Sequence, residues 1–297
     1  MLRIDAHQHF WQFDPVRDSW LREEDMYILR RDFGPVNFAP MLNANRFDGC
    51  VLVQVSQSPE ENTFQLAHAG SNPFVKGVVG WVDLQAADIA DQLAMYSEYP
   101  LLKGFRHILQ GETQRDFMLR PDFLRGIGTL KKFGFTYDIL IFPDQLAFTR
   151  EFVGDFPDQP FVLDHIAKPD IKGNSAFGES GSPKGGASGK ADPASLVAWQ
   201  KEIRELARFE NVSCKVSGMV TEAAWLTWKG VDFRPYLDTV VEAFGMKRLM
   251  FGSDWPMCLL SATYAETVAL VADYFAAFSI AEKAAFFGGN AVQFYNI

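Results

Sequence analysis

Short apolar segments rich in β-branched and aromatic residues recur along the chain, each followed by a segment with apolar residues spaced as on one face of a helix. This alternation is typical of βα units that build a parallel sheet. Eight strands are predicted, over residues 2–7, 50–55, 77–82, 104–108, 135–139, 161–165, 212–216 and 248–252. Helices are predicted near residues 60–71, 86–98, 121–133, 143–154, 194–209, 233–245 and 262–277.

Eight strands in 297 residues favour a single-domain (β/α)8 TIM-like barrel over residues 1–297, with an open doubly wound sheet as the alternative. No GxGxxG or GxxxxGK[ST] follows the first strand, which argues against nucleotide-binding forms of the open sheet. Two connections are long. Residues 10–40 form an aromatic loop that either covers the site or packs over the rim, and residues 173–191 form a Gly/Ser-rich insertion, expected to be flexible.

Charge and composition narrow the classes of partner. The chain has 28 Lys and Arg against 37 Asp and Glu, a formal net charge of −9, which argues against nucleic acid. No apolar segment reaches the ~18 residues of a membrane span, and Asp5, His7 and His9 interrupt the region where a signal peptide is apolar. The three cysteines indicate neither a disulfide framework nor a thiolate zinc site. We expect a cytoplasmic protein without a membrane partner, and the oligomeric state stays open.

Many of the predicted strands end in a polar or ionisable residue that can take part in catalysis or ligand binding. Polar groups are costly to bury unpaired, so a ring of them at strand ends indicates one shared site. His68 lies within a helical pattern and is expected to be structural, whereas the other four histidines belong to the ring. Its members are His7, His9, Gln54, Asp83, Arg106, His107, Asp138, His165, Lys215, Ser217 and Asp254.

His7 and His9 lie two residues apart on an extended segment, so both imidazoles face one side and can converge on one ion. A lone HxH is a weak signal, but His165 and Asp254 end two other strands. Three imidazoles and a carboxylate could hold one divalent cation such as Zn²⁺ and activate a water molecule. Alternatively no metal is required, and Asp254 acts as a general base while histidines and a cation polarise a carbonyl. The sequence leaves both possibilities open.

Arg106 and Lys215 are the cations at strand ends. Each is a candidate for binding a lactone oxygen or an oxyanion, with an ion pair to Asp83 or Asp138 as the structural alternative. The two acids are equally suited to anchoring a neighbouring loop or to contacting substrate. Trp81 and Trp255 stand next to polar positions and could pack against a sugar ring, although core packing is the simpler role for Trp81.

Five segments, in this order, resemble motifs of the amidohydrolase superfamily: DAHQHFW at 5–11, KGFRHILQ at 103–110, VLDHIAKPDI at 162–171, CKVSGM at 214–219 and FGSDWPMC at 251–258. They are most similar to its amidohydrolase-2 branch, which includes sugar lactonases and 2-pyrone-4,6-dicarboxylate lactonase. The resemblance implies a distorted barrel, hydrolysis of a ring ester and a catalytic carboxylate at Asp254. No lysine able to bridge two metals ends the fourth strand, where Arg106 and His107 stand, so a binuclear centre is not expected.

The sequence therefore predicts a hydrolase that opens a sugar lactone, derived from L-fucose or L-rhamnose, to its acid, with Asp254 as the base. A metal-dependent decarboxylase of aromatic acids and a non-catalytic sugar-binding barrel are the alternatives. The expected catalytic residues are Asp254, His165, Lys215 and His107; the expected substrate contacts are Arg106, Trp81, Asp83, Asp138, Ser217, Trp255 and Gln54; and the candidate single-metal ligands are His7, His9, His165 and Asp254.

Overall fold

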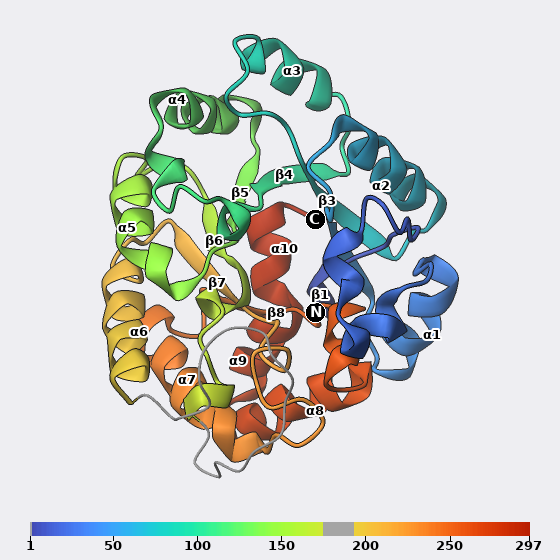
Figure 1. Ribbon diagram of the computed structural model, residues 1–297, viewed down its shortest axis with the longest axis vertical. Helices are drawn as coiled ribbons and strands as arrows, with labels where there is room; N and C mark the ends of the chain where they lie inside the picture. The colour runs from blue at the N-terminus through green and yellow to red at the C-terminus, as the bar shows by residue number, and fades with distance from the viewer. Residues whose placement is uncertain (1, 175–192) are drawn as a thin grey trace.

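The computed structural model describes residues 2–174 and 193–297. One sheet contains eight parallel strands in chain order. The end of the first strand and the segment that follows the last strand meet at an isolated bridge between Gln8 and Trp255. The sheet is therefore a nearly closed barrel, and the predicted (β/α)8 fold is confirmed (Figure 1). The strands are β1 (Ile4–Gln8), β2 (Gly49–Val53), β3 (Val75–Gly80), β4 (Leu102–His107), β5 (Thr136–Ile139), β6 (Phe161–Leu163), β7 (Val212–Val216) and β8 (Leu249–Phe251).

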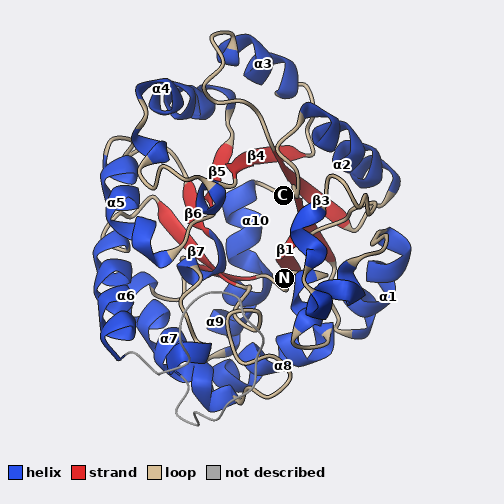
Figure 2. Ribbon diagram, in the orientation of Figure 1, coloured by secondary structure: helices blue, strands red, loops and turns tan. Residues whose placement is uncertain are grey.

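Helices surround the barrel, and all seven predicted ones are present with shifted ends (Figure 2). The helix α1 was missed because Pro40 lies inside it, and an interior proline argues against a helix. None of the helices among the described residues combines the length and apolar character needed to cross a membrane. The helices are α1 (Pro35–Ala44), α2 (Pro59–Ser71), α3 (Ile89–Tyr96), α4 (Pro121–Leu130), α5 (Leu146–Gly154), α6 (Pro193–Leu206), α7 (Gly230–Phe244), α8 (Tyr264–Tyr274), α9 (Ile280–Ala284) and α10 (Asn290–Tyr295).

Alternation along the strands separates two hydrophobic cores. Outward-facing residues pack under the helices, while a smaller cluster of inward-facing residues fills the barrel. The short C-terminal helix α10 contributes Ala291 and Tyr295 to this inner cluster and lies within the ring of strands (Figure 1). The inner strand residues are Ile4, Ala6, Val51, Val53, Val79, Val162 and Met250.

Specific contacts hold α10 against the N-terminal ends of the strands. Asn290 Nδ2 donates to the carbonyl oxygens of Met246 at 2.7 Å and Leu249 at 2.6 Å, next to the start of β8. Gly288 packs so closely on the start of β1 that a Cβ there would lie 1.9 Å from the oxygen of Leu2. The helix therefore closes this end of the barrel and leaves the opposite end for polar groups.

The connection from β1 to α1 is ordered by backbone pairing of Trp11 with Phe33. Trp11 is buried, whereas Trp20 and Tyr27 in the same connection are exposed. This connection thus packs against the rim beside the end of β1. The Gly/Ser-rich insertion expected at residues 173–191 lies outside the described residues except for its first two positions.

Candidate functional site

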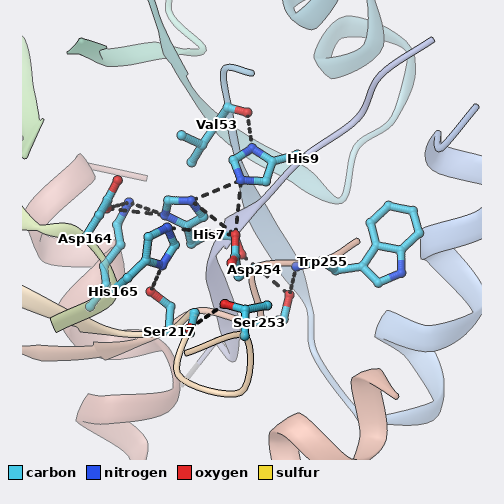
Figure 3. A network of polar contacts seen from close by, with 12 residues as sticks. His7, His9, Val53, Asp164, His165, Ser217, Ser253, Asp254 and Trp255 are labelled. Atoms are coloured by element: carbon cyan, nitrogen blue, oxygen red, sulfur yellow. Dashed lines mark hydrogen bonds and ion pairs between the residues drawn. The ribbon is translucent and has the colours of Figure 1, made fainter. Parts of the chain in front are cut away.

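Four side chains from distant parts of the chain converge beyond the C-terminal ends of the strands (Figure 3). His9 Nε2 lies 3.2 Å from His7 Nε2 and 3.3 Å from Asp254 Oδ1. His7 Nε2 and His165 Nε2 each lie 3.9 Å from the same Asp254 oxygen. All four residues are buried. The structure therefore brings together the HxH pair, the histidine after β6 and the aspartate after β8.

The orientation of His9 places two acceptors face to face. Its Nδ1 lies 2.7 Å from the oxygen of Val53, which only accepts hydrogen bonds, so Nδ1 carries a hydrogen. In the neutral ring Nε2 then has a lone pair directed at the carboxylate oxygen of Asp254, another acceptor, 3.3 Å away. This contact needs positive charge between or on the two groups, supplied by a second ring proton or by a bound cation.

The spacing of these atoms suits a small divalent ion. Bonds of ~2.0–2.1 Å in a tetrahedral arrangement separate ligand atoms by about 3.3 Å. The three atoms contributed by His7, His9 and Asp254 are 3.2, 3.3 and 3.9 Å apart. A second group, of His7, Asp164 and His165, also offers converging ligand atoms. In that group both Asp164 oxygens already pair with cations, at 3.0 Å from Arg106 and 3.0 Å from Lys215, so the first group fits the ion better.

Asp164 belongs to the site although the sequence did not indicate it. Adjacent residues on a strand face opposite sides, so Asp164 and His165 would be expected to diverge. Here β6 ends at Leu163, and the next residues turn sharply, with positive φ from His165 (54°) to Lys168 (49°). The turn directs both side chains inward. Only the proximity of Asp164 to His165 in the sequence could have suggested this.

Gly218 allows this turn to pack against the end of β7. It has a φ of +61°, and a Cβ there would lie 2.5 Å from His165 Nδ1. That nitrogen lies 2.9 Å from Ser217 Oγ, which fixes the ring with Nε2 towards Asp254. Ser217 therefore orients His165.

Lys215 and Asp138 lie deeper than expected. Both are fully buried, with Lys215 Nζ 2.5 Å from Asp138 Oδ2 and 3.1 Å from His7 Nδ1. The ion pair with Asp138, given above as the structural alternative for Lys215, is thus present. The contacts of Lys215 with an oxyanion and of Asp138 with substrate stay predictions. Burial raises the pKa of Asp138 to about 6 even though Lys215 opposes the shift. Burial alone would also raise the pKa of Asp164, but Lys215, His7 and Arg106 outweigh it and hold that pKa well below its usual value.

Arg106 lies beside the histidines and is held by Gln54. Its Nη1 donates to Asp164 at 3.0 Å and lies 3.2 Å from His7 Nε2, while Nη2 donates to the main chain and side chain of Gln54. Gln54 Nε2 donates back to the Arg106 oxygen at 3.0 Å. Gln54 is fully buried and positions Arg106, and its contact with substrate stays a prediction. Within the described part of the chain, Arg106 Nε is buried without a hydrogen-bond partner.

The charges of the central groups follow from burial and mutual contacts. Burial lowers the pKa values of His7 and His165 well below the ordinary value, so both rings are neutral near pH 7. Burial also acts to raise the pKa of Asp254, but His165 and His9 outweigh it and the net shift is downward. The site thus combines an ionised carboxylate with neutral imidazoles, an arrangement that can accept a proton or bind a cation.

Comparison with known proteins agrees with this geometry. The model of a family described as amidohydrolase matches residues 4–297. The chain belongs to the amidohydrolase family. It is 37% identical over 300 residues to an L-fucono-1,5-lactonase from Burkholderia multivorans, covering 99% of this chain and 96% of that protein. An L-fucono-1,5-lactonase from Burkholderia ambifaria is 33% identical over 301 residues, covering 99% and 96%.

A solved structure of a related amidohydrolase has the same fold as this chain. A crystal structure of an amidohydrolase from Burkholderia multivorans with bound zinc matches with a TM-score of 0.90 and 36% identity, covering 100% of both chains. This chain is therefore an enzyme of a hydrolase family with a conserved overall architecture.

Some residues expected at the site of this amidohydrolase lie outside the convergent group. His107 Nε2 lies 2.7 Å from Glu112 Oε1, and its ring stacks on Phe117 with centroids 5.0 Å apart. Glu112 therefore occupies Nε2 of His107, and Phe117 covers one face of its ring. The structure therefore gives no support to a catalytic role for His107 and places it in the wall formed by the segment after β4.

The aromatic and acidic candidates near β3 and β8 also separate from the group. Trp255 is fully buried and packs on Phe38 with centroids 4.9 Å apart, and Figure 3 shows its ring directed away from the imidazoles. The ring therefore contributes to the core in this structure, and its contact with substrate stays a prediction. Asp83 is exposed and accepts from the backbone N–H of Gln85 at 3.0 Å, which anchors its own loop. Trp81 is half-buried, with its backbone bonded to the Asn62 side chain.

Asp5 supports the amidohydrolase site from below. Its Oδ1 accepts from the backbone N–H of His7 at 3.2 Å and of Ser253 at 2.9 Å. It therefore ties β1 to the segment that carries Asp254, across the seam where the barrel closes. In the sequence Asp5 was noted only for interrupting an apolar region, and its distant partner Ser253 left no signal there.

Proposed function

We propose that this amidohydrolase hydrolyses the 1,5-lactone of a six-carbon deoxy-sugar acid, with L-fucono-1,5-lactone as the first candidate substrate. The observation that carries the proposal is the ionised Asp254 carboxylate among three imidazoles at the mouth of the barrel. The full-length similarity to two L-fucono-1,5-lactonases supports the choice of substrate class.

In the proposed reaction, Asp254 accepts a proton from water as the water oxygen attacks the lactone carbonyl carbon. Negative charge then develops on the carbonyl oxygen, which the imidazoles and the Arg106 guanidinium would stabilise; Arg106 Nη1 lies 3.2 Å from His7 Nε2. The bond between the carbonyl carbon and the ring oxygen breaks. The ring oxygen takes the proton held by Asp254 and leaves as a hydroxyl group, so the carboxylate is regenerated and the product acid releases one proton to solvent.

We further propose that His7, His9, His165 and Asp254 hold one divalent cation such as Zn²⁺. When bound, such an ion would polarise a carbonyl or lower the pKa of a water molecule. Support comes from the acceptor-to-acceptor contact between His9 and Asp254 and from the zinc in the related crystal structure. Calorimetric titration of metal-free protein with zinc should show one site, and His9→Ala should weaken it. Unchanged binding in that variant would contradict this ligand set.

A lactone panel read with a pH indicator tests the function, with uncatalysed hydrolysis subtracted. Asp254→Asn should lower kcat by roughly 10²–10⁴-fold without loss of folded protein, because an amide cannot act as the base. The matched control is Asp91→Asn, the same change at an exposed position of α3. Near-normal turnover by the Asp254 variant would remove it from the mechanism. Carbon dioxide release from hydroxybenzoates, without lactone turnover, would instead support the decarboxylase alternative.

A further inference from the structure

A chain of hydrogen bonds connects the C-terminal helix to the catalytic histidines. The Tyr295 hydroxyl, on α10, donates to Asp138 Oδ2 at 2.8 Å. Lys215 Nζ donates to the same oxygen at 2.5 Å and lies 3.1 Å from His7 Nδ1. Lys215 Nζ also lies 3.0 Å from Asp164 Oδ1. All five residues are almost completely inaccessible to solvent, and their direct contacts link the floor of the barrel to its mouth.

Packing alone does not explain a tyrosine at this position. The Tyr295 ring lies in the inner apolar cluster, where phenylalanine would fill the same space. A fully buried hydroxyl is costly unless it is bonded, and the bond that it makes here is to Asp138. The hydroxyl therefore has a polar role.

That role follows from the way Asp138 is held. Its Oδ2 accepts both bonds, from Tyr295 and from Lys215, while Oδ1 has no hydrogen-bond partner among the described residues. The two donors on one oxygen fix the rotation of the carboxylate. Without the tyrosine hydroxyl, the carboxylate can turn either oxygen towards Lys215, and the ammonium group can move with it.

Movement of Lys215 would be transmitted to His7. His7 Nδ1 faces two groups, the donor Lys215 Nζ at 3.1 Å and the acceptor Asp164 Oδ1 at 3.3 Å. The position of the ammonium group, which also contacts both carboxylates, therefore determines whether Nδ1 accepts from Lys215 or donates to Asp164. In a neutral imidazole the environment of Nδ1 sets which nitrogen carries the hydrogen, and hence whether Nε2 presents a lone pair. His7 Nε2 is the atom that faces His9 and Asp254.

We propose that Tyr295 is a positioning residue that acts through Asp138 and Lys215 to orient His7 and set its tautomer. The C-terminal helix then belongs to the working site and not only to the scaffold. The expected effect of Tyr295 on kcat rests on the proposed lactonase function. None of Tyr295, Asp138 or Lys215 is exposed to substrate, so the effect falls on the chemical step and not on substrate binding.

Tyr295→Phe tests this with two measurements. With L-fucono-1,5-lactone, kcat should fall about tenfold while KM stays within twofold of wild type. In protein labelled with ¹³C and ¹⁵N in its histidine rings, the ring resonances of His7 should shift while those of His68, on α2, should not. His7→Gln assigns the His7 signals. The control is Tyr274→Phe, which removes a similar tyrosine-to-aspartate bond, to Asp238 at 2.6 Å, between the outer helices α7 and α8.

The two readouts separate this inference from the proposed function. A His7 shift in a protein that turns over no lactone would support the positioning role and count against the lactonase. Unchanged His7 resonances would overturn the positioning role, as would an equal change in kcat for the Tyr274 control. If the Tyr295 variant folds poorly, Asp138→Asn replaces it, because the same displacement of Lys215 should shift His7, and an unshifted His7 again overturns the inference.

Discussion

Asp5→Asn isolates the energetic effect of a buried carboxyl group beneath the site. Asp5 is fully buried, and burial raises its pKa from 3.8 to about 6 although bonds from Ser253, His7 and Tyr264 oppose the shift. Asparagine keeps the Oδ1 acceptor for the backbone N–H groups of His7 and Ser253 and removes the ionisation. The local geometry should therefore survive the change.

The direction and magnitude of the change in stability with pH follow from the difference between the pKa of Asp5 in the folded and the unfolded protein. The unfolded chain loses this proton near pH 3.8, whereas the folded protein holds it to about pH 6. The stability that this group contributes to the wild type is fully present below pH 3.8 and is lost as pH rises through about 6. At 1.36 kcal/mol per unit, the stability of Asp5→Asn relative to wild type should rise by about 3 kcal/mol in total, about half of it between pH 5 and pH 8.

Urea unfolding of both proteins at pH 5, 6, 7 and 8, with a chelator present, measures this difference, and other titrating groups cancel in the subtraction. Asp91→Asn is the control, since its exposed carboxyl should give a difference that hardly changes with pH. A constant difference for Asp5→Asn, or one that favours the wild type as pH rises, would refute the assignment of a protonated buried carboxyl.

Three further substitutions test other features. Gly218→Ala places a Cβ 2.5 Å from His165 Nδ1 at a φ of +61°, so kcat should fall at least tenfold and the protein should lose about 1–3 kcal/mol, measured by kinetics and urea unfolding. Trp255→Ala should cost ~3–5 kcal/mol of stability because the ring is fully buried. A raised KM at unchanged stability would instead indicate that Trp255 contacts substrate. Lys215→Met removes the cation from two buried carboxylates and should cost about 3–5 kcal/mol, which a chemical denaturation midpoint near that of wild type would contradict.

The strands and the convergence of two histidines with Asp254 could be predicted because periodicity carries their signal. Each strand is a short apolar segment, and His9, His165 and Asp254 follow the last residue of β1, β6 and β8. Residues just beyond a strand reach the mouth of a barrel. Lys215 and Asp138 resemble them in the sequence but lie inside β7 and β5, where the side chain points into the barrel interior. Whether a side chain lies inside the barrel or at its mouth depends on one or two residues along the strand. The end of a strand cannot be located from the sequence with that precision.

Other features depended on tertiary contacts. The positive φ values after His165 arise where the turn packs against the end of β7, and nothing in the local sequence, which lacks glycine there, indicates them. The helix α10 has six residues, too few to show a helical period, and its partners are the starts of β1 and β8. Asp164 and Tyr295 were missed for these two reasons.

The position of α10 has a consequence for how the enzyme is made. Translation proceeds from the N terminus, so the eight strands emerge before the last residues that fill the barrel floor. Until α10 has emerged from the ribosome, the inner apolar surface lacks its cover and Asp138 lacks one of its two donors. A nascent or truncated polypeptide that stops before α10 should therefore be both inactive and prone to aggregate.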